Sequence, residues 1–462
     1  MHEPTTNQHW TLSELCQALK DDLVALKGST RQTFPSITTD SRAVAKGQVF
    51  VALVGEKFDG HDYALAAEKA GAGALVLNRS VGAACPELIV NDTDEAYGRL
   101  ARFWRHRFSL PVIAVVGSNG KTTTTQMVGA VLFSYAGDAS FCTRGNLNNN
   151  VGVPRMLLEL TERTRIAVIE AGMNHAGEMA QLASWIAPTV VVITNAQREH
   201  QAYIDGVEGS ARENAMALVA LPETGCAVLP ITDSCYRIWA DFARARGCRV
   251  LTYSAGESAA DVQAVRERGD LVLTTPLGVT RFAFSMAGEH AVHDAAAAAA
   301  ASLAAGVPLE DIACGLTSFT ALDGRGKIHR FESGALLIDE SYNANPDSMR
   351  SAIDVLATMP SPHILVAGEM GELGDKSRDY HEEVLRYAKD KGIDALYLTG
   401  KPMKDAMGAA GDAAHFYATR EALTRAVQEA IQTPCTVLIK ASHSVGLDAV
   451  VRAVTIDLKK GS

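Results

Sequence analysis

The chain has 462 residues, of which 47% are hydrophobic and 21% charged, the composition of a globular protein with more than one domain. A net charge of −10 argues against a nonspecific nucleic-acid binder, because such proteins carry a basic face. The eight cysteines form no Cys-x-x-Cys pair, so we expect neither a disulfide framework nor a zinc site. We find no signal-peptide pattern and no window of ~18 uninterrupted apolar residues, and therefore expect a cytoplasmic protein without membrane insertion.

Short runs typical of β-strands begin the chain, and a helical stretch, YALAAEKAGA (63–72), lies among them. This mixture predicts a small α/β domain over residues 1–90. The strand-like runs are SITTDS (36–41), QVFVALVG (48–55) and GALVLN (73–78).

Longer apolar runs alternate with helical stretches over the next part of the chain. Because these runs are continuous rather than alternating, they predict a parallel sheet that helices cover on both faces. We expect this central domain, a P-loop, ATPase-like parallel-sheet domain, to span residues 91–316. Its predicted strands are PVIAVVG (111–117), RIAVIEAGM (165–173), TVVVITN (189–195), GCAVLP (225–230) and CRVLTYS (248–254).

An alanine-rich helix and a second helical segment, GVPLEDIACGL (306–316), end this series, and a break follows at residues 317–326. A new alternation of strands and helices then predicts a doubly wound, Rossmann-like domain over residues 317–462. The expected fold class is therefore α/β, in three domains. The strands predicted for the last domain are GALLIDES (334–341), HILVAGEM (363–370), DALYLTG (394–400) and CTVLIKAS (435–442).

The segment VIAVVGSNGKTTTT (112–125) predicts a strand, a phosphate-binding loop and a helix. Its glycines let the backbone approach a phosphate, and the start of the helix adds a partial positive charge. Lys121 is placed for the outer phosphates of ATP, and the Thr122 hydroxyl for Mg²⁺. The common pattern has a glycine where this chain has Val115, so the loop is a shortened variant; the alternative is a glycine turn with a surface lysine. The predicted ATP-binding residues of the loop are Gly117, Ser118, Asn119, Gly120, Lys121, Thr122 and Thr123.

Several motifs, in the same order along the chain, resemble those of the Mur ligases, amide-forming enzymes of peptidoglycan precursor synthesis. GSNGKTTT (117–124) resembles their ATP loop, and the segment 38–63 resembles their uridine-nucleotide-binding segment. IEAGMNHAGEM (169–179) and TNAQREH (194–200) resemble their magnesium-binding strand ends. GNLNNNVGVP (145–154) is similar to a substrate-contacting loop, and DESYNANPDSM (339–349) and GEMGELGDKSRDYH (368–381) resemble motifs of the family member that adds D-Ala-D-Ala.

This resemblance implies a reaction of UDP-MurNAc-tripeptide, D-Ala-D-Ala and ATP, with Mg²⁺, that gives UDP-MurNAc-pentapeptide, ADP and phosphate. It also implies one domain for the UDP substrate, one for ATP and a third that closes over the nucleotide. A carboxylate is a poor acyl donor, and transfer of the γ-phosphate onto it makes an acyl phosphate that an amine can attack. We expect a monomer.

The resemblance assigns roles at the ends of two central strands. Glu170 and His200 are implied as metal ligands together with Thr122, since carboxylate and hydroxyl oxygens suit Mg²⁺. The residues expected to be catalytic are Lys121, Glu170, His200 and Arg325, and Arg325 is expected to reach the ATP phosphates when the third domain closes. A salt-bridged acid and a surface histidine are the alternatives for Glu170 and His200.

The remaining assignments concern ATP and the peptidyl substrate. Asp339 is expected to accept hydrogen bonds from the ribose and Asn343 to contact the nucleotide. Arg42 has a planar fork that can bind phosphate oxygens or stack on uracil, with a structural salt bridge as the alternative. The expected substrate-binding residues are Ser41, Arg42, Asn148, Asn149, Asn345 and Ser442, and positions near the dipeptide are Glu372, His381, Lys440 and Ser442.

The chain departs from the family pattern at a few positions. Many Mur ligases carry a carbamylated lysine where this chain has Asn214, which cannot be carbamylated. Either the neighbouring Glu213 supplies the carboxylate or a second metal is held with more water, and we favour the second, since adjacent helical residues point ~100° apart. On the adenine side, HAVHD (290–294) replaces a usual His-Asn-x-x-Asn. Glu340 stands where Asp is usual, and Ala441, Ser442 and His443 replace a usual Gly-Ser-Arg.

Other functions remain as alternatives. One is an amide ligase of the same fold that uses another amino acid or folate, against which the segments 38–63 and 339–349 argue. Another is a binding protein that has lost catalysis, against which the retained loop and strand-end residues argue. A generic P-loop ATPase is disfavoured, because no Walker-type aspartate motif follows an apolar strand.

Overall fold

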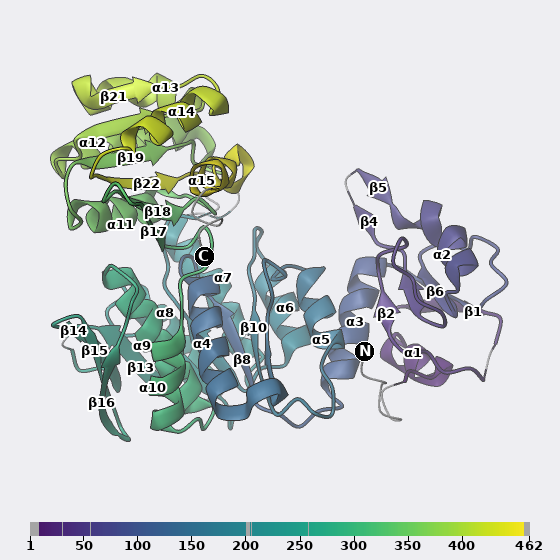
Figure 1. Ribbon diagram of the computed structural model, residues 1–462. Helices are drawn as coiled ribbons and strands as arrows, with labels where there is room; N and C mark the ends of the chain where they lie inside the picture. Colours follow the sequence, from purple (N-terminus) through teal and green to yellow (C-terminus); the bar gives the residue numbers. More distant parts are fainter. Residues whose placement is uncertain are drawn as a thin grey trace.

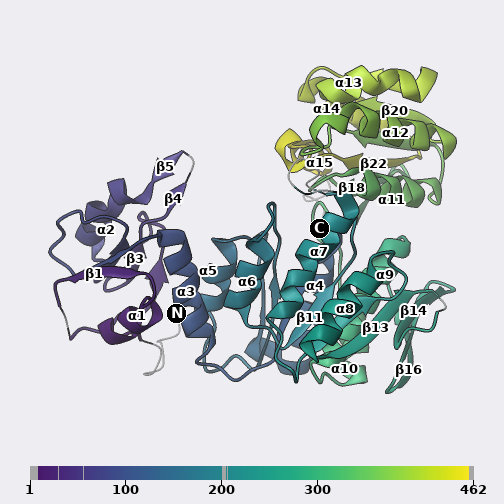
Figure 2. The ribbon, with the colours of Figure 1, turned by 180° about the vertical axis from the view of Figure 1, so that it is seen from behind.

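The computed structural model describes residues 9–29, 31–55, 57–199, 204, 206–256 and 258–456. Three main sheets follow one another along the chain, and each is the centre of one structural unit (Figure 1). The N-terminal unit (β1–β7, α1–α3) lies beside the central unit (β8–β16, α4–α10), and the C-terminal unit (β17–β22, α11–α15) lies over the central one, as the reverse view also shows (Figure 2). The α/β fold class is confirmed. Within the described residues, no helix combines the length and apolarity that a membrane crossing requires.

The N-terminal unit is built on a five-stranded sheet of order β1-β7-β6-β3-β2. Its strands pair in parallel except β1, which lies antiparallel at the edge, and β4 and β5 form a separate small hairpin. The predicted strand-like runs and helix are confirmed here. The elements are α1 (Leu12–Ala18), β1 (Leu23–Lys27), β2 (Ile37–Thr38), β3 (Val49–Val51), β4 (Val54–Gly55), β5 (Phe58–Asp59), η1 (Gly60–Tyr63), α2 (Ala64–Ala70), β6 (Ala74–Leu77) and β7 (Glu87–Val90).

Helix α3 (Thr93–Arg105) joins the N-terminal and central units, because it packs on both. Trp104 stacks on Trp10 with ring centroids 5.1 Å apart inside the N-terminal core. On the central side, the Arg105 guanidinium is buried and donates to the carbonyls of Ile186 (3.1 Å) and Ala187 (3.2 Å) at the end of α6. Burying a charged group is tolerated when its donors are satisfied in this way, so the joint is tight.

The central sheet has nine strands in the order β16-β15-β14-β13-β12-β11-β8-β10-β9. The strands from β9 to β14 in this order pair in parallel, which is the arrangement predicted, although β9 and β14 were not among the predicted strands; β15 and β16 extend the sheet as an antiparallel meander. The meander was not predicted, because its strands mix charged and apolar residues and no helices separate them. The strands are β8 (Val112–Val116), β9 (Ser140–Cys142), β10 (Ile166–Glu170), β11 (Val190–Ile193), β12 (Cys226–Pro230), β13 (Arg249–Ala255), β14 (Val262–Glu267), β15 (Asp270–Thr275) and β16 (Gly278–Ala283).

Helices cover both faces of this sheet. Successive side chains of a strand point to opposite faces, so Ile113 and Val115 join one core while Val112, Ala114 and Val116 join the other. Both cores are made of buried hydrophobic side chains, and this explains the continuous apolar runs in the sequence. The helices are α4 (Lys121–Ala136), η2 (Gly137–Ala139), α5 (Gly152–Leu158), α6 (Glu178–Ile186), α7 (Gly206–Val219), α8 (Tyr236–Arg246), α9 (Glu289–Ala304) and α10 (Leu309–Ser318).

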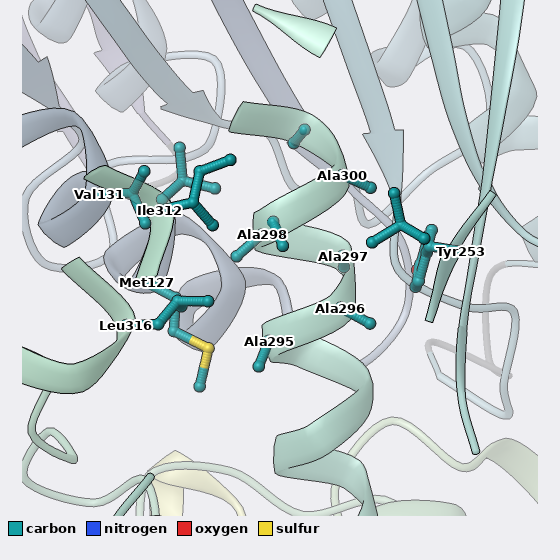
Figure 3. Close-up of a cluster of buried hydrophobic side chains, with 14 of the residues drawn as sticks. Met127, Val131, Tyr253, Ala295, Ala296, Ala297, Ala298, Ala300, Ile312 and Leu316 are labelled. Carbon is teal, nitrogen blue, oxygen red and sulfur yellow. The ribbon is translucent and has the colours of Figure 1, made fainter. Parts of the chain in front are cut away.

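The alanine-rich helix α9 is buried among α4, α10 and the strands around β13 (Figure 3). Its alanines from Ala295 to Ala301 are fully buried, and their small side chains let Met127, Val131, Ile312 and Leu316 approach from one side and Tyr253 from the other. Close packing of this kind leaves α9 little freedom to shift. The first turn of α9, at the edge of the sheet, is therefore held in one position.

The C-terminal unit has a six-stranded sheet of order β17-β18-β22-β19-β20-β21, parallel except for β17. The predicted strands of this unit are confirmed, and helices lie on both faces. The elements are β17 (Lys327–Arg330), β18 (Leu336–Glu340), α11 (Pro346–Ala357), β19 (His363–Ala367), η3 (Gly374–Lys376), α12 (Ser377–Asp390), β20 (Ala395–Leu398), α13 (Lys401–Ala406), η4 (Met407–Ala413), β21 (Ala414–Phe416), α14 (Arg420–Ala430), β22 (Thr436–Lys440), η5 (His443–Val445) and α15 (Asp448–Thr455).

Candidate active site

A cavity of about 950 Å³ lies between the central and C-terminal units. Its central wall is formed by residues that follow β8, β10 and β11, and its other wall by residues that follow β18 and β22. Both sheets therefore contribute the carboxyl ends of parallel strands, the edge at which open α/β sheets bind ligands. No residue of the N-terminal unit is among those that line it in the described part of the chain.

The phosphate loop between β8 and α4 depends on its two glycines. Gly117 has φ +130° and Gly120 has φ +81°, conformations that other residues rarely adopt. A Cβ at Gly117 would lie 2.1 Å from the Thr194 hydroxyl, and one at Gly120 would lie 2.3 Å from an Asp294 carboxylate oxygen. Helix α4 begins at the next residue, so its positive end meets the cavity.

The Lys121 ammonium lies folded over this loop. It donates to the carbonyls of Gly117 (2.5 Å) and Ser118 (2.9 Å) and lies 3.4 Å from the Glu199 carboxylate. These contacts hold the amine on the cavity wall where the sequence predicts the outer phosphates of ATP.

Glu170, the last residue of β10, is the centre of a buried polar group. Its Oε1 accepts hydrogen bonds from the Thr122 hydroxyl (3.1 Å) and from the Asn148 amide (2.7 Å). Its Oε2 is buried and accepts no hydrogen bond from the described residues. An unpartnered carboxylate oxygen beside a threonine hydroxyl is a suitable donor set for a hard cation such as Mg²⁺. Two of the three predicted metal ligands, Thr122 and Glu170, are thus together.

His200, the third predicted metal ligand, lies outside the described residues. Within the described ranges, no group of three His, Cys, Asp or Glu side chains forms a complete metal site. The described neighbour of His200, Glu199, is buried on the cavity wall next to Lys121. The Glu199 carboxylate was not predicted, although its place just after β11 follows the same strand-end rule that identified Glu170.

The loop after β11 is bonded to the phosphate loop. The Asn195 carbonyl accepts from the Ser118 amide (3.0 Å), and the Asn195 side chain accepts from the Asn119 amide (2.9 Å). The Gln197 amide donates to the Ser118 hydroxyl (3.0 Å). These bonds shape the predicted ATP-binding residues Ser118 and Asn119, and Thr123 also lines the cavity.

The opposite wall carries the cationic side chains of the C-terminal unit. The Arg325 guanidinium lies 3.9 Å from the centroid of the Tyr342 ring, a cation–π contact, and the His443 ring lies on Tyr342 as well, at 5.3 Å. Lys440 is buried and donates to the Asn343 carbonyl (2.8 Å) and to Glu340 (3.3 Å). Burial lowers the pKa of Lys440.

One predicted ATP ligand of the 339–345 segment, Asp339, has different surroundings from those expected. The Asp339 carboxylate is buried and accepts from the Gly324 amide (2.7 Å) and from the Ser341 hydroxyl (2.6 Å) and amide (3.1 Å). Asp339 is not among the described residues that line the cavity, and its hydrogen bonds instead hold the loop residues Gly324 and Ser341 in place. The neighbouring Glu340 does line the cavity. A strand places consecutive side chains on opposite faces, and this is why only one of the two reaches the site.

Asn345 and Asn343 are both on the cavity wall. The Asn345 side chain caps α11 by accepting from the Ser348 amide (2.8 Å), and the Ser348 hydroxyl accepts from the Asn345 amide (3.0 Å), a reciprocal capping box. The Asn345 side chain also donates through Nδ2 to the Asn119 Oδ1 of the phosphate loop (2.9 Å). It therefore links the two walls.

The first turns of α9 form the end of the cavity. His290, His293 and Asp294 line it. Burial lowers the pKa of both histidines and raises the pKa of Asp294. The Tyr253 hydroxyl donates to the carbonyls of Ile193 and Thr194, beneath the same end.

Some of the residues predicted near the dipeptide line the cavity, and another supports a loop of its wall. Ser442 and Glu372 line the cavity, and the Ser442 hydroxyl accepts from the Gly371 amide (2.5 Å). His381 is fully buried instead: its Nε2 accepts from the Met370 amide (3.0 Å) and its Nδ1 donates to the Ser377 carbonyl (2.6 Å). It supports the loop that carries Glu372 rather than touching the cavity.

The other predicted substrate residues are placed as follows. Asn148 and Asn149 line the cavity, but the Asn149 side chain accepts from the amides of Val151 (3.2 Å) and Gly152 (2.9 Å) and so fixes the start of α5. Ser41 and Arg42 lie in the N-terminal unit, away from the cavity. The exposed Arg42 forms a fork with Asp40 (2.9 Å on both arms) that lowers the pKa of Asp40 to about 2.

Position 214 is buried on α7. The Asn214 amide donates to the Ser210 carbonyl (2.9 Å). The neighbouring Glu213 carboxylate accepts from the amides of Gly177 (2.8 Å) and Met179 (3.0 Å), so it holds the start of α6. Of the two alternatives raised by the sequence, the one in which Glu213 replaces the missing carboxylate is disfavoured.

Comparison with known proteins decides the family. Models described as Mur ligase family, catalytic domain, Mur ligase middle domain, and Mur ligase, glutamate ligase domain match residues 33–105, 115–302 and 324–443. The UDP-N-acetylmuramoyl-tripeptide–D-alanyl-D-alanine ligase of Escherichia coli (strain K12) is 36% identical over 448 residues, 96% of this chain and 98% of that protein. The chain belongs to the Mur ligase family.

Other relatives agree with this assignment of the Mur ligase. The ligase of the same name from Bacillus subtilis (strain 168) is 32% identical over 435 residues, which cover 90% of this chain and 92% of that protein. A crystal structure of MurF from Acinetobacter baumannii superimposes with a TM-score of 0.90 at 31% identity, covering 97% of this chain and 99% of that one. MurF from Thermotoga maritima, solved in complex with ADP, has a TM-score of 0.80 at 24% identity, over 92% of this chain and 98% of that one, and supports the fold.

Proposed function

We propose that this Mur ligase joins D-Ala-D-Ala to UDP-MurNAc-tripeptide with the hydrolysis energy of ATP, as the MurF-type name of its relatives describes. The observation that carries the proposal is the full-length identity to those ligases, 36% over 96% of the chain. The cavity agrees with it, since a phosphate loop and a strand-end carboxylate on one unit face cationic side chains on another.

The chemistry requires two steps at one carboxylate. An oxygen of the tripeptide carboxylate attacks the γ-phosphorus of ATP, the bond to ADP breaks, and an acyl phosphate forms. The amine of D-Ala-D-Ala then attacks the acyl carbon, loses a proton and expels inorganic phosphate, which retains one oxygen of the original carboxylate. Positioning and charge stabilisation contribute most to such transfers.

Each wall supplies part of that stabilisation. Lys121 and the amides of residues 117–120 bind the β- and γ-phosphates, and Arg325 approaches the same phosphates from the C-terminal unit. Stacking on Tyr342 holds the Arg325 fork in one plane, so its donors can bind two oxygens at once. His290, His293 and Asp294 receive the base, and Glu340 with Asn343 receives the ribose, in place of the Asp339 that the sequence predicted.

Thr122, Glu170 and His200 would hold Mg²⁺, and the fit rests on the unpartnered Glu170 Oε2 beside the Thr122 hydroxyl. When bound, the cation offsets the negative charge of the phosphates. Asn148, which donates to the other Glu170 oxygen, orients the carboxylate for this task.

Recognition of the UDP substrate is assigned to the N-terminal unit, where Ser41 and Arg42 present a hydroxyl and an exposed guanidinium. Asn148, Asn149, Asn345 and Ser442 are assigned to the peptidyl part and the dipeptide. We retain the predicted division into domains at residues 1–90, 91–316 and 317–462, and a monomer, as parts of this proposal.

Phosphate release and isotope tracing test the proposal. Release should require both UDP-MurNAc-tripeptide and D-Ala-D-Ala, and oxygen-18 placed in the tripeptide carboxylate should be found in the released phosphate. Release without either substrate would identify an ATPase, and absence of release under every condition would identify a binding protein. Turnover with a different amino acid in place of the dipeptide would identify another Mur-type ligase.

A further inference from the structure

The loop after β11 lies between the phosphate loop and the C-terminal unit. As described above, Asn195 and Gln197 are bonded to Ser118 and Asn119. The residue that follows, Arg198, points the other way, toward α11 and α12 of the C-terminal unit. One short segment therefore contacts both the phosphate loop and the C-terminal unit.

Arg198 makes five charge-assisted side-chain hydrogen bonds across the two units. Its Nε donates to both Asp347 oxygens (3.1 Å each) and its Nη2 to Asp347 Oδ1 (2.6 Å), while Nη1 and Nη2 donate to the two Glu383 oxygens (2.8 and 3.0 Å). The Arg198 amide also donates to Asp347 (2.9 Å). The guanidinium lies 5.2 Å from the Tyr380 ring. A planar fork of donors is the group that can satisfy two carboxylates in this way.

This contact differs from an ordinary surface ion pair. The three side chains are each less than a third exposed, at 22% for Arg198, 24% for Asp347 and 30% for Glu383. Hydrogen bonds from Arg198 lower the pKa of Glu383, and the two carboxylates together raise the pKa of Arg198. Partial burial and bidentate geometry are the conditions under which ion pairs contribute measurably.

Through Asp347, the Arg198 side chain holds the start of α11. Asp347 is in the first turn of that helix, two residues after the cap Asn345, which is itself bonded to Asn119 of the phosphate loop. The segment before the cap carries Glu340, Tyr342 and Asn343, which form the opposite wall of the cavity. Fixing the start of α11 therefore fixes that wall relative to the phosphate loop.

We propose that Arg198 is a positioning residue that couples the phosphate loop to the C-terminal unit through Asp347 and Glu383, so that Arg325 is aligned with the bound nucleotide. This proposal rests on the proposed ligase function. Arg198 touches no reacting atom in it; the residue acts through the placement of α11 and the wall that precedes it. Loss of Arg198 should therefore slow the chemical steps more than it weakens binding of the UDP substrate.

Arg198→Met and Arg350→Met form a matched pair of variants. Arg350 donates to the same Glu383 carboxylate (3.2 Å), but this bond joins α11 to α12 and therefore stays inside the C-terminal unit. Arg198→Met should lower kcat about 10-fold, the equivalent of one well-placed ion-pair contact, with little change in affinity for the UDP substrate. Arg350→Met should leave kcat within about twofold. Arg198→Lys keeps the charge without the fork and should restore only part of the rate.

Amide hydrogen exchange on the full chain supplies a readout that does not depend on turnover. Exchange in residues 117–120, 324–326 and 340–349 should become faster in Arg198→Met than in Arg350→Met, because one variant releases the contact between units and the other does not. Equal rates and equal exchange in the two methionine variants, or full activity of Arg198→Met, would overturn the proposal. Failure of the wild-type chain to form any amide product would overturn the ligase function instead, and the exchange comparison would still test the coupling.

Discussion

The Lys121 ammonium is held by oxygen atoms, the kind of partner that a phosphate group would also supply. Two loop carbonyls and the Glu199 carboxylate surround the ammonium at 2.5–3.4 Å. An ammonium is a compact charge with three donors, and it exchanges oxygen partners at small cost when a phosphate arrives. The protein's own hydrogen bonds thus hold the loop in shape, and under the proposed function Lys121 would exchange its oxygen partners for those of a phosphate.

Replacing Lys121 with alanine should abolish ligation while binding of UDP-MurNAc-tripeptide survives, because Lys121 serves the ATP site and the UDP substrate is assigned to another unit. Phosphate release measures the first effect and isothermal calorimetry the second. Lys401→Ala, which removes an exposed helical ion pair with Asp405, is the control and should change neither. An equal loss of ligation and of UDP-substrate affinity in Lys121→Ala would contradict the separation of sites.

Asn214 leads to a second prediction, which concerns the effect of bicarbonate on the ligation rate. Its side chain is buried and donates to the Ser210 carbonyl, and an amide cannot react with carbon dioxide to form a carbamate. We expect the ligation rate to be the same in bicarbonate-depleted buffer and in buffer with added bicarbonate. A clear rise on addition would show that a lysine elsewhere in the chain is carbamylated and contributes to the site.

At the scale of elements, loops at the ends of strands carry the chemistry and buried side chains hold those loops. His381 on α12 is the clearest support. It joins the Met370 amide to the Ser377 carbonyl and is inaccessible to solvent. Both ring nitrogens are used, one as acceptor and one as donor, so the neutral ring is the form that fits. Protonation would turn the acceptor into a second donor that faces an amide hydrogen.

The stability of the C-terminal unit should therefore depend on pH through His381. Burial lowers the His381 pKa below its ordinary value of about 6.5, so the contribution of the neutral ring is complete above about pH 6.5 and is lost as the pH falls through the lower, folded pKa. In this acidic range the free energy of unfolding should fall by at most about 1.4 kcal/mol per pH unit for this one proton. Urea unfolding at several pH values measures it.

His381→Gln is the matched variant, because the glutamine carbonyl can still accept from the Met370 amide but cannot be protonated in this range. The slope of stability against pH should be shallower in His381→Gln than in the wild type. Other histidines with a lowered pKa, His106, His290 and His293, contribute equally to both proteins. Identical slopes would show that His381 is not the group that titrates.

Elements and site residues were predictable to different degrees. Most parallel strands of the central and C-terminal units were found because buried strands leave continuous apolar runs. The short edge strands β9 and β21 left no such signal, and neither did the β14–β16 meander, which is half polar and has no intervening helices. The grouping of Thr122 with Glu170 followed from the motifs that resemble those of the Mur ligases, and the structure places the Thr122 hydroxyl 3.1 Å from Glu170 Oε1. The sequence could not show that Asp339 is turned away from the cavity while Glu340 faces it, since that depends on the register of one strand.

At the scale of the whole molecule, the two joints between units are built differently. The joint through α3 is apolar and tight: it includes Trp104 in the N-terminal core, the buried Arg105 and the close contact of Gly98 with Trp185. The contact with the C-terminal unit is made by polar side chains, such as Arg198 with Asp347 and Asn119 with Asn345. The two contacts therefore differ in kind: the joint with the N-terminal unit is buried, whereas the contact with the C-terminal unit consists of polar side chains, several of which are partly exposed.

Gly98→Ala tests the buried joint, and two opposing effects decide its sign. Alanine favours a helix over glycine by about 0.5–1 kcal/mol. A Cβ at Gly98, however, would lie 2.0 Å from the ring of Trp185, which is itself buried, and overpacking of this kind costs about 1–3 kcal/mol. We expect a net loss of stability in Gly98→Ala, measured by thermal or urea unfolding, together with weaker binding of the UDP substrate as the N-terminal unit shifts.

Gly408→Ala is the control for this variant, because a Cβ at Gly408 in η4 meets nothing within 4 Å. It should leave the free energy of unfolding unchanged or slightly higher. Hydrogen exchange at the phosphate loop should be the same in both alanine variants, since the joint at Gly98 and the Arg198 contact lie at different boundaries of the central unit. If Gly98→Ala were as stable as Gly408→Ala, the Trp185 ring would accommodate the added methyl group and the joint would not be tightly packed. If Gly98→Ala altered exchange at the phosphate loop as Arg198→Met does, the two joints would not be independent of each other.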